Sequence, residues 1–369
     1  SILSTNMIGL SDFYTGAFPA EYGASLSGIF DLKFRNGNNQ QREYAFQAGV
    51  LGMEFAAEGP FKKGYDGSYL INYRYSTFAL MDQLNFEISQ NALPNYQDLS
   101  YKINLPTKRA GTFSLWAIGG MGDDDEKYLP DSTTSENPEN GYRDYTRTGM
   151  YAMGLSHTIF PDDQSYLKTV VSHSMSGSTN HYYQMDSLGI LHTNWYDEMQ
   201  NKAFRISTLY NRKVSSKHTL RAGLIYNNLN YSYFAEQAEA DWTLSPVLNS
   251  DGSTMLFQGY LQGKYKFTEK VLMTAGLHYA YFHQSRDHSL EPRLGLQIEL
   301  PKRQKLSFGF GHHSKNENLP VYFVEQQGDD GSLFMPNLDL KMIRSTHYVA
   351  GYDLMFGKDM HFKLETYYQ

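Results

Sequence analysis

The stretch that decides the fold class is MLFQGYLQGKYKF, residues 255–267. Every second position holds an apolar residue or a glycine (Met255, Phe257, Gly259, Leu261, Gly263, Tyr265 and Phe267), and the positions between them include Gln258, Gln262, Lys264 and Lys266. Successive side chains of a β-strand point to opposite faces, so this period of two predicts a strand with one apolar and one wet face. Helical spacing does not fit the pattern.

The same alternation recurs along nearly the whole chain. In residues 271–281, Met273, Leu277 and Tyr281 share one face and Thr274 and His278 share the other. Residues 294–300 and 360–368 alternate in the same way. The sequence therefore predicts an all-β protein.

Composition indicates where the apolar faces point. Aromatic residues make up 15% of the chain, with 30 Tyr and 22 Phe, yet the mean hydropathy is -0.53. A transmembrane barrel has this combination, because its strands face lipid on one side and a wet lumen on the other, with aromatic girdles at both interfaces. No apolar run approaches the ~18 residues of a spanning helix, so strands must make any crossing. The net charge of -7 argues against a nucleic-acid partner, because there is no surplus of basic residues to neutralise phosphates.

Connection lengths alternate between short and long, which predicts the topology. Short connections are expected at residues 60–67, 106–111, 161–164, 215–218, 268–270, 301–304 and 357–359, as periplasmic turns. Long ones are expected at residues 78–95, 121–142, 180–200, 235–252 and 315–340, as extracellular loops. This sorting is typical of an outer-membrane antiparallel β-barrel, and it gives about fifteen strands. Bacterial single-chain barrels have an even number of strands, so we expect further native sequence beyond the C-terminus of this chain.

The N-terminal residues carry a family resemblance. The stretches GAFPAEYG (16–23), SGIFDL (27–32) and RNGN (35–38) resemble the end of the plug domain of TonB-dependent receptors. Further stretches are similar to barrel strands of the receptor branch that has an N-terminal carboxypeptidase-regulatory-like domain: AAEGPF (56–61), YLINYRYS (69–76), LEPRLG (290–295) and KLETYYQ (363–369).

The resemblance implies two parts and a function. Residues 1–38 would be the C-terminal end of a plug domain, and residues 39–369 a partial transmembrane β-barrel of a 22-stranded family. It also implies active import across the Gram-negative outer membrane, with membrane lipid and TonB as partners, although the sequence contains no TonB box. No enzyme activity and no cofactor are expected.

Two sets of residues are candidates for the contact between plug and barrel. Glycines supply turns and close backbone approach, and Pro19 fixes a bend, although such residues mark a tight hairpin in any fold. The predicted junction is Gly16, Pro19, Glu21, Tyr22, Gly23, Gly28 and Arg35. Wet-face charges would form ion pairs with the plug, or be tolerated because the lumen is wet: Glu54, Arg74, Lys102, Arg293, Glu299, Arg344 and Glu365.

Aromatic residues in the expected outer loops are candidates for contact with a solute by stacking. These are Tyr128, Trp195, Tyr196, Trp242 and Tyr322, for which an interface girdle or loop packing is the alternative.

Other candidate chemistry is weak. The run from Asp123 to Glu126 lacks the spacing of a calcium loop and is expected to be a solvated loop tip. His312 and His313 point to opposite faces of a strand, so no metal site is expected there.

Two alternatives to import remain at this point. One is a structural or accessory subunit of a larger outer-membrane assembly, for example for protein export, with a surface lipoprotein or membrane complex as partner. The other is a soluble all-β binding module. The soluble module would have a dry core in place of a wet lumen.

Overall fold

The computed structural model describes residues 4–49, 52–77, 95–128, 130, 141–328, 330–357 and 360–369. Fifteen strands form one antiparallel sheet in which each strand pairs with the strands of this sheet that precede and follow it in sequence, from β3 at one edge to β19 at the other. β16 and β17 lie outside this sheet, so β15 pairs with β18. Their number agrees with the prediction. The strands are β3 (Glu43–Ala48), β4 (Met53–Pro60), β5 (Ser68–Tyr75), β6 (Asn95–Pro106), β7 (Thr112–Tyr128), β8 (Tyr142–Asp162), β9 (Ser165–Met185), β10 (Leu191–Lys213), β11 (His218–Ala238), β12 (Leu244–Lys266), β13 (Val271–Phe282), β14 (Asp287–Leu300), β15 (Gln304–Lys315), β18 (Ile343–Phe356) and β19 (Met360–Tyr368).

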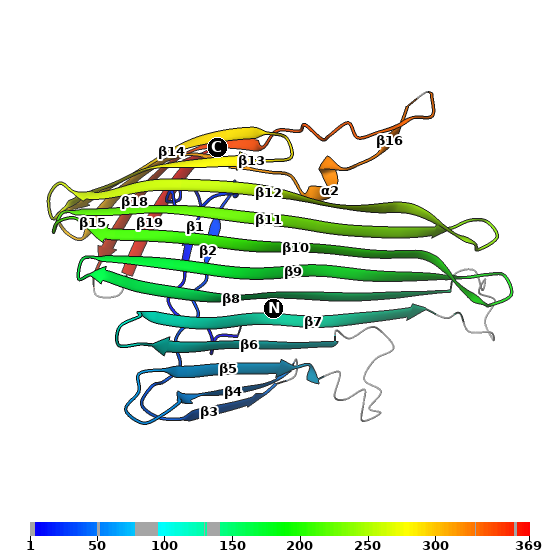
Figure 1. Cartoon of the computed structure of the whole chain (residues 1–369), viewed down its shortest axis with the longest axis horizontal. Coiled ribbons are helices and arrows are strands. Elements are labelled where there is room, and N and C mark those ends of the chain that lie inside the picture. Colours follow the sequence, from blue (N-terminus) through cyan, green and yellow to red (C-terminus); the bar gives the residue numbers. More distant parts are fainter. Residues whose placement is uncertain are drawn as a thin grey trace.

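The sheet is strongly curved, and the N-terminal segment, residues 4–38, lies on its concave side (Figure 1). This segment contains a two-stranded sheet of β1 (Asp12–Tyr14) and β2 (Ile29–Asp31), in which the rings of Phe13 and Phe30 lie 5.6 Å apart. The concave surface is called the inner wall below, and the convex surface the outer wall.

The structure confirms the predicted faces of the strands. Leu277 is 43% exposed on the outer wall, whereas His278, the next residue, is fully buried and contacts the N-terminal segment. Phe257 and Leu261 of β12 are likewise exposed, while Gln258 and Gln262 are buried on the inner wall. Alternation of side chains along these strands therefore separates an apolar outer surface from a polar interior.

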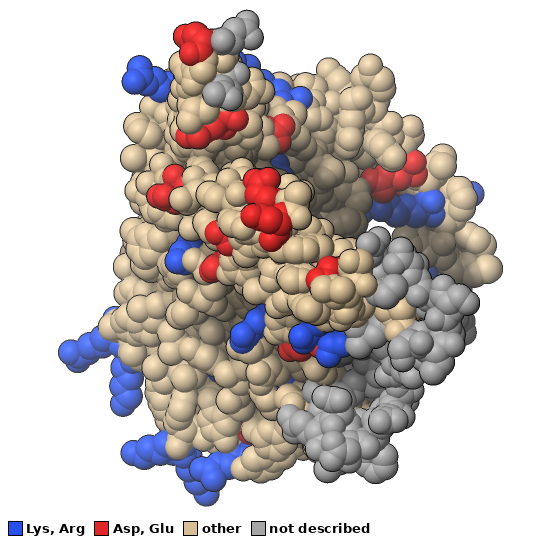
Figure 2. All heavy atoms as spheres, turned by 90° about the vertical axis from the view of Figure 1, so that its right-hand side faces the viewer, with Lys and Arg blue, Asp and Glu red and all other residues tan. Residues whose placement is uncertain are grey.

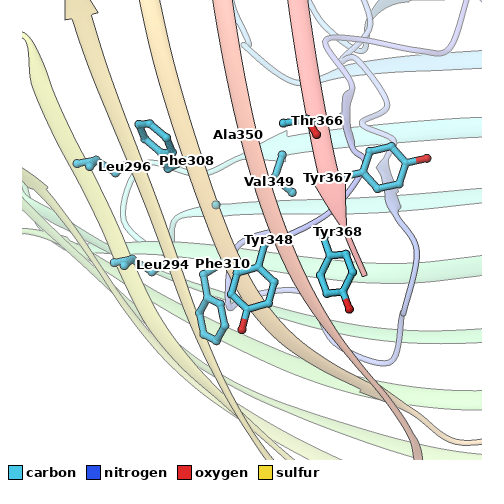
Figure 3. A pocket seen from close by; sticks show the side chains of 11 residues that line it. Leu294, Leu296, Phe308, Phe310, Tyr348, Val349, Ala350, Thr366, Tyr367 and Tyr368 are labelled. Atoms are coloured by element: carbon cyan, nitrogen blue, oxygen red, sulfur yellow. The ribbon is translucent and has the colours of Figure 1, made fainter.

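The outer wall is apolar over several strands. Leu294, Phe308, Phe310, Tyr348 and Tyr368 come from β14, β15, β18 and β19 and line a shallow groove on this wall (Figure 3). A continuous apolar surface of this kind fits contact with hydrocarbon. None of the helices in the described residues has the length and apolarity needed to cross a bilayer.

The connections differ in part from the prediction. The short turns lie where expected; at 301–303, for example, Lys302 and Arg303 both adopt positive φ. Two connections expected to be long are mostly strand, because β9 and β10 leave only residues 186–190 between them, and β11 and β12 leave only residues 239–243. The polar residues there resemble a loop by composition, but cross-strand pairing extends both hairpins.

The remaining predicted loops have different outcomes. Of residues 121–142, those up to Tyr128 belong to β7 and Tyr142 begins β8, and most of the rest lie outside the described residues. The loop predicted at 78–95 also lies outside the described residues, except Asn95, which begins β6. Residues 316–342 do form a long connection, which contains α2 (Leu319–Tyr322), β16 (Gln326–Gln327) and β17 (Leu333–Phe334).

A buried apolar cluster lies under this long connection rather than between two sheets. Leu319, Tyr322 and Met342 of the connection pack against inner-wall residues of β11, β12 and β13, namely Tyr231, Leu256, Ala280 and Phe282. The rest of the inner wall carries buried polar residues, which argues against a soluble module with a dry core.

Candidate functional site

The inner wall holds one turn of the N-terminal segment, residues 17–23, through Arg293 of β14. Nη1 of Arg293 donates to the carbonyl oxygens of Pro19, at 2.7 Å, and Tyr22, and the Phe18 carbonyl oxygen lies 3.5 Å away. The guanidinium carbon also lies 4.8 Å from the centre of the Phe18 ring. Because Arg293 is 4% exposed, these charge-assisted hydrogen bonds form out of water, where they are strong.

The charge of Arg293 is balanced by Glu291, two positions earlier on the same face of β14. Nη2 of Arg293 donates to Glu291 Oε2 at 2.5 Å, and both side chains are buried. A buried ion pair of this kind is costly to disrupt on one side, since the remaining charge is left without a partner.

Neighbouring strands hold the same turn through polar side chains. The backbone N–H of Ala20 donates to Gln262 Oε1 at 2.7 Å, and His278 Nδ1 lies 2.8 Å from the Ala20 carbonyl oxygen, to which it donates. The Phe18 ring lies 4.0 Å from the ring of His313, whose two nitrogens have no hydrogen-bond partner among the described residues. The turn thus docks through main-chain contacts with β12, β13 and β14.

Glycine permits the close approach of the turn to the wall. A Cβ atom on Gly23 would overlap Gln258 Oε1 and the ring of His278, and one on Gly276 would lie 2.6 Å from the Ala20 Cβ. Both positions therefore require the residue without a side chain.

Tyr22 is also tied within the N-terminal segment. Its hydroxyl donates to Asp31 Oδ2 at 2.8 Å. Burial, together with the adjacent Asp31 carboxylate, raises the pKa of Tyr22, so the hydroxyl remains protonated and able to donate.

Ion pairs join both sides of the segment to other strands. Arg35 donates through both terminal nitrogens to Glu58 of β4, at 2.7 and 2.6 Å, and Arg221 of β11 binds Glu21 at 2.7 Å. Hydrogen bonds to uncharged groups add to these ion pairs. Glu54 of β4 accepts from Ser4 and Asn6, Lys102 of β6 donates to the Phe34 carbonyl oxygen, and Glu365 of β19 accepts from Thr15.

An aromatic row lines the inner face where β7, β8 and β9 extend toward the long connections. The rings of Tyr128 and Tyr142 lie 6.1 Å apart, and Tyr142 stacks on Tyr182 at 6.2 Å. Trp195 of β10 belongs to the same face, and its indole N–H donates to the buried Asp197 at 2.6 Å. Trp242, in the turn between β11 and β12, stacks on His192 at 4.7 Å.

Comparison with known proteins identifies the family. The model of the family described as "TonB dependent receptor-like, beta-barrel" matches residues 82–369. This chain belongs to that family. Its members are outer-membrane proteins of Gram-negative bacteria and not enzymes, which places this receptor in the outer membrane.

Solved structures share the fold of the receptor. The siderophore receptor PiuA from Acinetobacter baumannii superposes with a TM-score of 0.70 at 10% identity, covering 98% of this chain and 62% of that one. PirA from the same organism gives 0.64 at 14% identity, covering 97% and 57%. The outer membrane transporter YddB from Escherichia coli gives 0.57 at 11% identity, covering 94% and 54%. The receptor chain spans less than two thirds of the length of each. No curated protein sequence matches it significantly.

Most of the predicted junction residues lie at the interface between the N-terminal segment of the receptor and the inner wall. Pro19, Glu21, Tyr22, Gly23 and Arg35 make the contacts described above, and a Cβ on Gly16 would lie 3.4 Å from His347 Nδ1 of β18. Gly28 is different. A Cβ there would meet the Tyr14 carbonyl oxygen, so this glycine serves the β1–β2 hairpin rather than the wall.

The predicted wet-face charges divide into two groups. Glu54, Lys102, Arg293 and Glu365 contact the N-terminal segment. Arg74 instead pairs with Asp98 of β6, Arg344 pairs with Asp287 of β14, and Glu299 is exposed at the far end of β14.

The predicted outer aromatics need three corrections. Trp195 and Tyr196 lie in strand β10 rather than in a loop, and they face opposite sides, since Tyr196 contacts His181 and Phe234 on the outer wall. Tyr128 ends strand β7. Tyr322 is 0% exposed in the apolar cluster under α2, so it offers no surface to a solute.

Two minor expectations can also be compared with the structure. Asp123 to Glu126 belong to β7, and Asp125 pairs with Arg143 and Lys127, so the run is not a free loop tip. His312 binds Thr346 on one face while His313 is buried on the other, as predicted. Within the described ranges, no three metal-ligating side chains are grouped to hold an ion.

Sequence reasoning missed Gln262, His278, Glu291 and His313 as interface residues. Their inward position follows from the alternation, but the partners of Gln262, His278 and His313 in the N-terminal segment lie more than 240 residues away in sequence. Glu291 acts on that segment through Arg293. The signal that could have found them is an unusual density of His and Gln on the wet faces of adjacent strands.

Exchange of Gly23 for alanine is expected to lower the free energy of unfolding by about 1–3 kcal/mol, because the added Cβ overlaps the Gln258 and His278 side chains. Urea titration of the receptor in lipid would measure this value. The matched control is Gly263→Ala in β12, where nothing lies within 4 Å of an added Cβ. Equal losses for the two variants would contradict the close approach.

Proposed function

We propose that this receptor imports a scarce or large solute across the outer membrane by TonB-dependent active transport. In this proposal residues 1–38 are the end of a plug domain, and residues 39–369 are part of the barrel wall. The observation that carries the proposal is the docking of turn 17–23 on the inner wall through Arg293. A segment docked on the inner wall in this way would obstruct an open pore, so transport would require the segment to move.

The contacts support a segment that can be displaced. Apart from Ser4, Met7, Phe18, Ala20 and Gly37, the segment is half-buried or exposed, and it is tied to the wall largely by hydrogen bonds and ion pairs. Partly exposed ion pairs such as Arg221–Glu21 contribute ~0–1 kcal/mol each, because water replaces them readily. A pull from the periplasmic side by TonB, the partner expected for the family, would exchange these partly exposed ion pairs for water at low cost.

The inner aromatic row is proposed as the capture surface. Tyr128, Tyr142, Tyr182 and Trp195 offer rings for stacking at the end of the sheet that carries the long connections. Asp and Glu side chains form several patches when this end is viewed directly (Figure 2). Acidic side chains at this end of the sheet favour neutral or cationic solutes over polyanions, because like charges repel. PiuA and PirA are siderophore receptors. If this receptor also carries an iron chelate, the acidic side chains would favour an uncharged or cationic chelate over a polyanionic one.

Cells that produce the full-length receptor would test transport directly. Labelled iron chelates, oligosaccharides, peptides and vitamins would be supplied singly, with TonB present or deleted. We expect uptake of one solute class to require both the receptor and TonB. Uptake that persists without TonB would indicate a passive pore, and a barrel that takes up none of the classes would favour the accessory role in a larger assembly.

The capture surface has a matched pair of variants in adjacent residues. Trp195→Ala removes an inner ring, whereas Tyr196→Ala removes a ring from the outer wall of the same strand. We expect Trp195→Ala to weaken binding of the transported solute about twofold to tenfold, since one stacked ring contributes roughly 0.5–1.5 kcal/mol beyond the area it buries. Tyr196→Ala should leave binding unchanged. Equilibrium binding to the purified receptor measures both, and a loss confined to Tyr196→Ala would exclude the inner row.

A further inference from the structure

The connection 316–342 folds inward and is anchored at two places on the inner wall. Its α2 helix contributes Leu319 and Tyr322 to the buried apolar cluster, where the Tyr322 ring lies 5.1 Å from that of Phe282. At its end the backbone N–H of Met342 donates to Asp287 Oδ2 at 3.0 Å, and Arg344 pairs with the same carboxylate. The connection is therefore part of the packed interior.

The N-terminal segment reaches the same cluster. Ala24, which directly follows the docked turn, packs against it as a partly buried apolar residue. Ala24 has a φ of 53°, so the backbone at this contact is held in the left-handed region. The connection and the segment thus share one apolar contact.

A polar route joins the two elements as well. The Ser314 hydroxyl, on β15, lies 3.7 Å from Met342 Sδ and donates to Glu291 Oε1 at 2.5 Å. The other oxygen of Glu291 accepts from Arg293, which holds turn 17–23. Asp287, Glu291 and Arg293 share the inner face of β14, so a single row of side chains runs from the end of the connection to the docked turn.

We infer that movement of the connection 316–342 changes the hold of the inner wall on turn 17–23, through Met342, Ser314, Glu291 and Arg293. Glu291 is the positioning residue, because its two carboxylate oxygens serve opposite ends of the route. Glu291 is fully buried, so if Oε1 loses the hydrogen bond from Ser314, no water molecule can replace that donor. The carboxylate then reorients toward other donors, and the geometry of the Arg293 pair changes with it.

This inference deepens the proposed function by naming the outer element that controls the segment. Its test requires neither the solute nor TonB, so its failure would leave the transport proposal standing. These 369 residues contain no cysteine, so once any cysteine elsewhere in the full-length receptor is replaced by serine, single cysteines report accessibility without a background. Ala20→Cys, at a position 1% exposed, reports the docked turn, and Leu319→Cys, at a position 8% exposed, reports α2.

The experiment measures the rate at which a water-soluble maleimide modifies each cysteine in the full-length receptor in proteoliposomes. Ser314→Ala removes the hydroxyl between the two ends, and we expect it to speed modification of Ala20→Cys about threefold or more, as coupled neighbours do. Ser314→Thr keeps the hydroxyl and should restore the slow rate. The matched control is Ser114→Ala on β7, an inner-wall serine that donates to Asn104.

The reverse direction uses a change in the segment. Phe18→Ala removes the buried ring beside Arg293 and should speed modification of Leu319→Cys, whereas Phe13→Ala removes an exposed ring of the same segment and should not. If Ser314→Ala changes only Leu319→Cys, the two elements are independent and the inference is wrong. If the control variants have effects as large as the test variants, general loosening of the receptor explains the data and the inference is equally wrong.

Discussion

Replacement of Arg293 by methionine is expected to lower the free energy of unfolding of the receptor by about 3–5 kcal/mol. The variant leaves the Glu291 carboxylate fully buried without its cation, and it removes the donor from the carbonyl oxygens of Pro19 and Tyr22. Urea titration in lipid, followed through tryptophan fluorescence, would measure the loss.

A double variant separates the two causes of that loss. Glu291→Leu combined with Arg293→Met removes both charges, and it should recover much of the stability, since apolar residues replace buried ion pairs well. The docked turn would still lack its donor. Modification of Ala20→Cys should therefore remain fast in the double variant. A loss below about 1 kcal/mol for Arg293→Met would show that the guanidinium is not needed at this interface.

Exchange of Leu277 for arginine on the outer wall should cost about 2–4 kcal/mol if this position lies near the bilayer midplane. The side chain is 43% exposed on the face that we assign to lipid, where a guanidinium has neither water nor a partner. Thr274→Arg places the same group on the other face of β13, which borders the wet interior, and its effect should be much smaller. Refolding titrations into bilayers measure both values. Similar costs for the two substitutions would contradict the assignment of faces.

The sequence contained enough information for the fold because period-two alternation is a local signal. Residues 255–267 and 271–281 specify the inner and outer faces of β12 and β13 without reference to any distant residue. The number of strands follows from the same local signal and the turns between strands. The lengths of the outer loops are predicted less accurately than the faces of the strands. The stretch 180–200 is polar like a loop, but most of it pairs as strands β9 and β10.

The site was only partly predictable, for a different physical reason. Charged and glycine residues such as Arg293, Arg35 and Gly23 stand out in the sequence because they are unusual on a strand or mark a turn. The sequence places Tyr322 in an outer loop, yet the apolar wall residues beneath α2 bury it, and these residues range from Tyr231 to Phe282 on earlier strands. Contacts such as Gln262 with Ala20 depend on where the whole sheet curves, which no local pattern contains.

The most direct test of the account is a spin-label scan of β13 in bilayers, in which one cysteine at a time replaces residues 273 to 278 of the cysteine-free chain. Each label would be exposed to oxygen, which concentrates in hydrocarbon, and to a water-soluble nickel chelate. The account predicts oxygen accessibility with a period of two, high at positions 273, 275 and 277 and low at 274, 276 and 278. Uniform accessibility, or maxima at 274 and 278, would contradict a sheet whose outer wall faces lipid and whose inner wall holds the N-terminal segment.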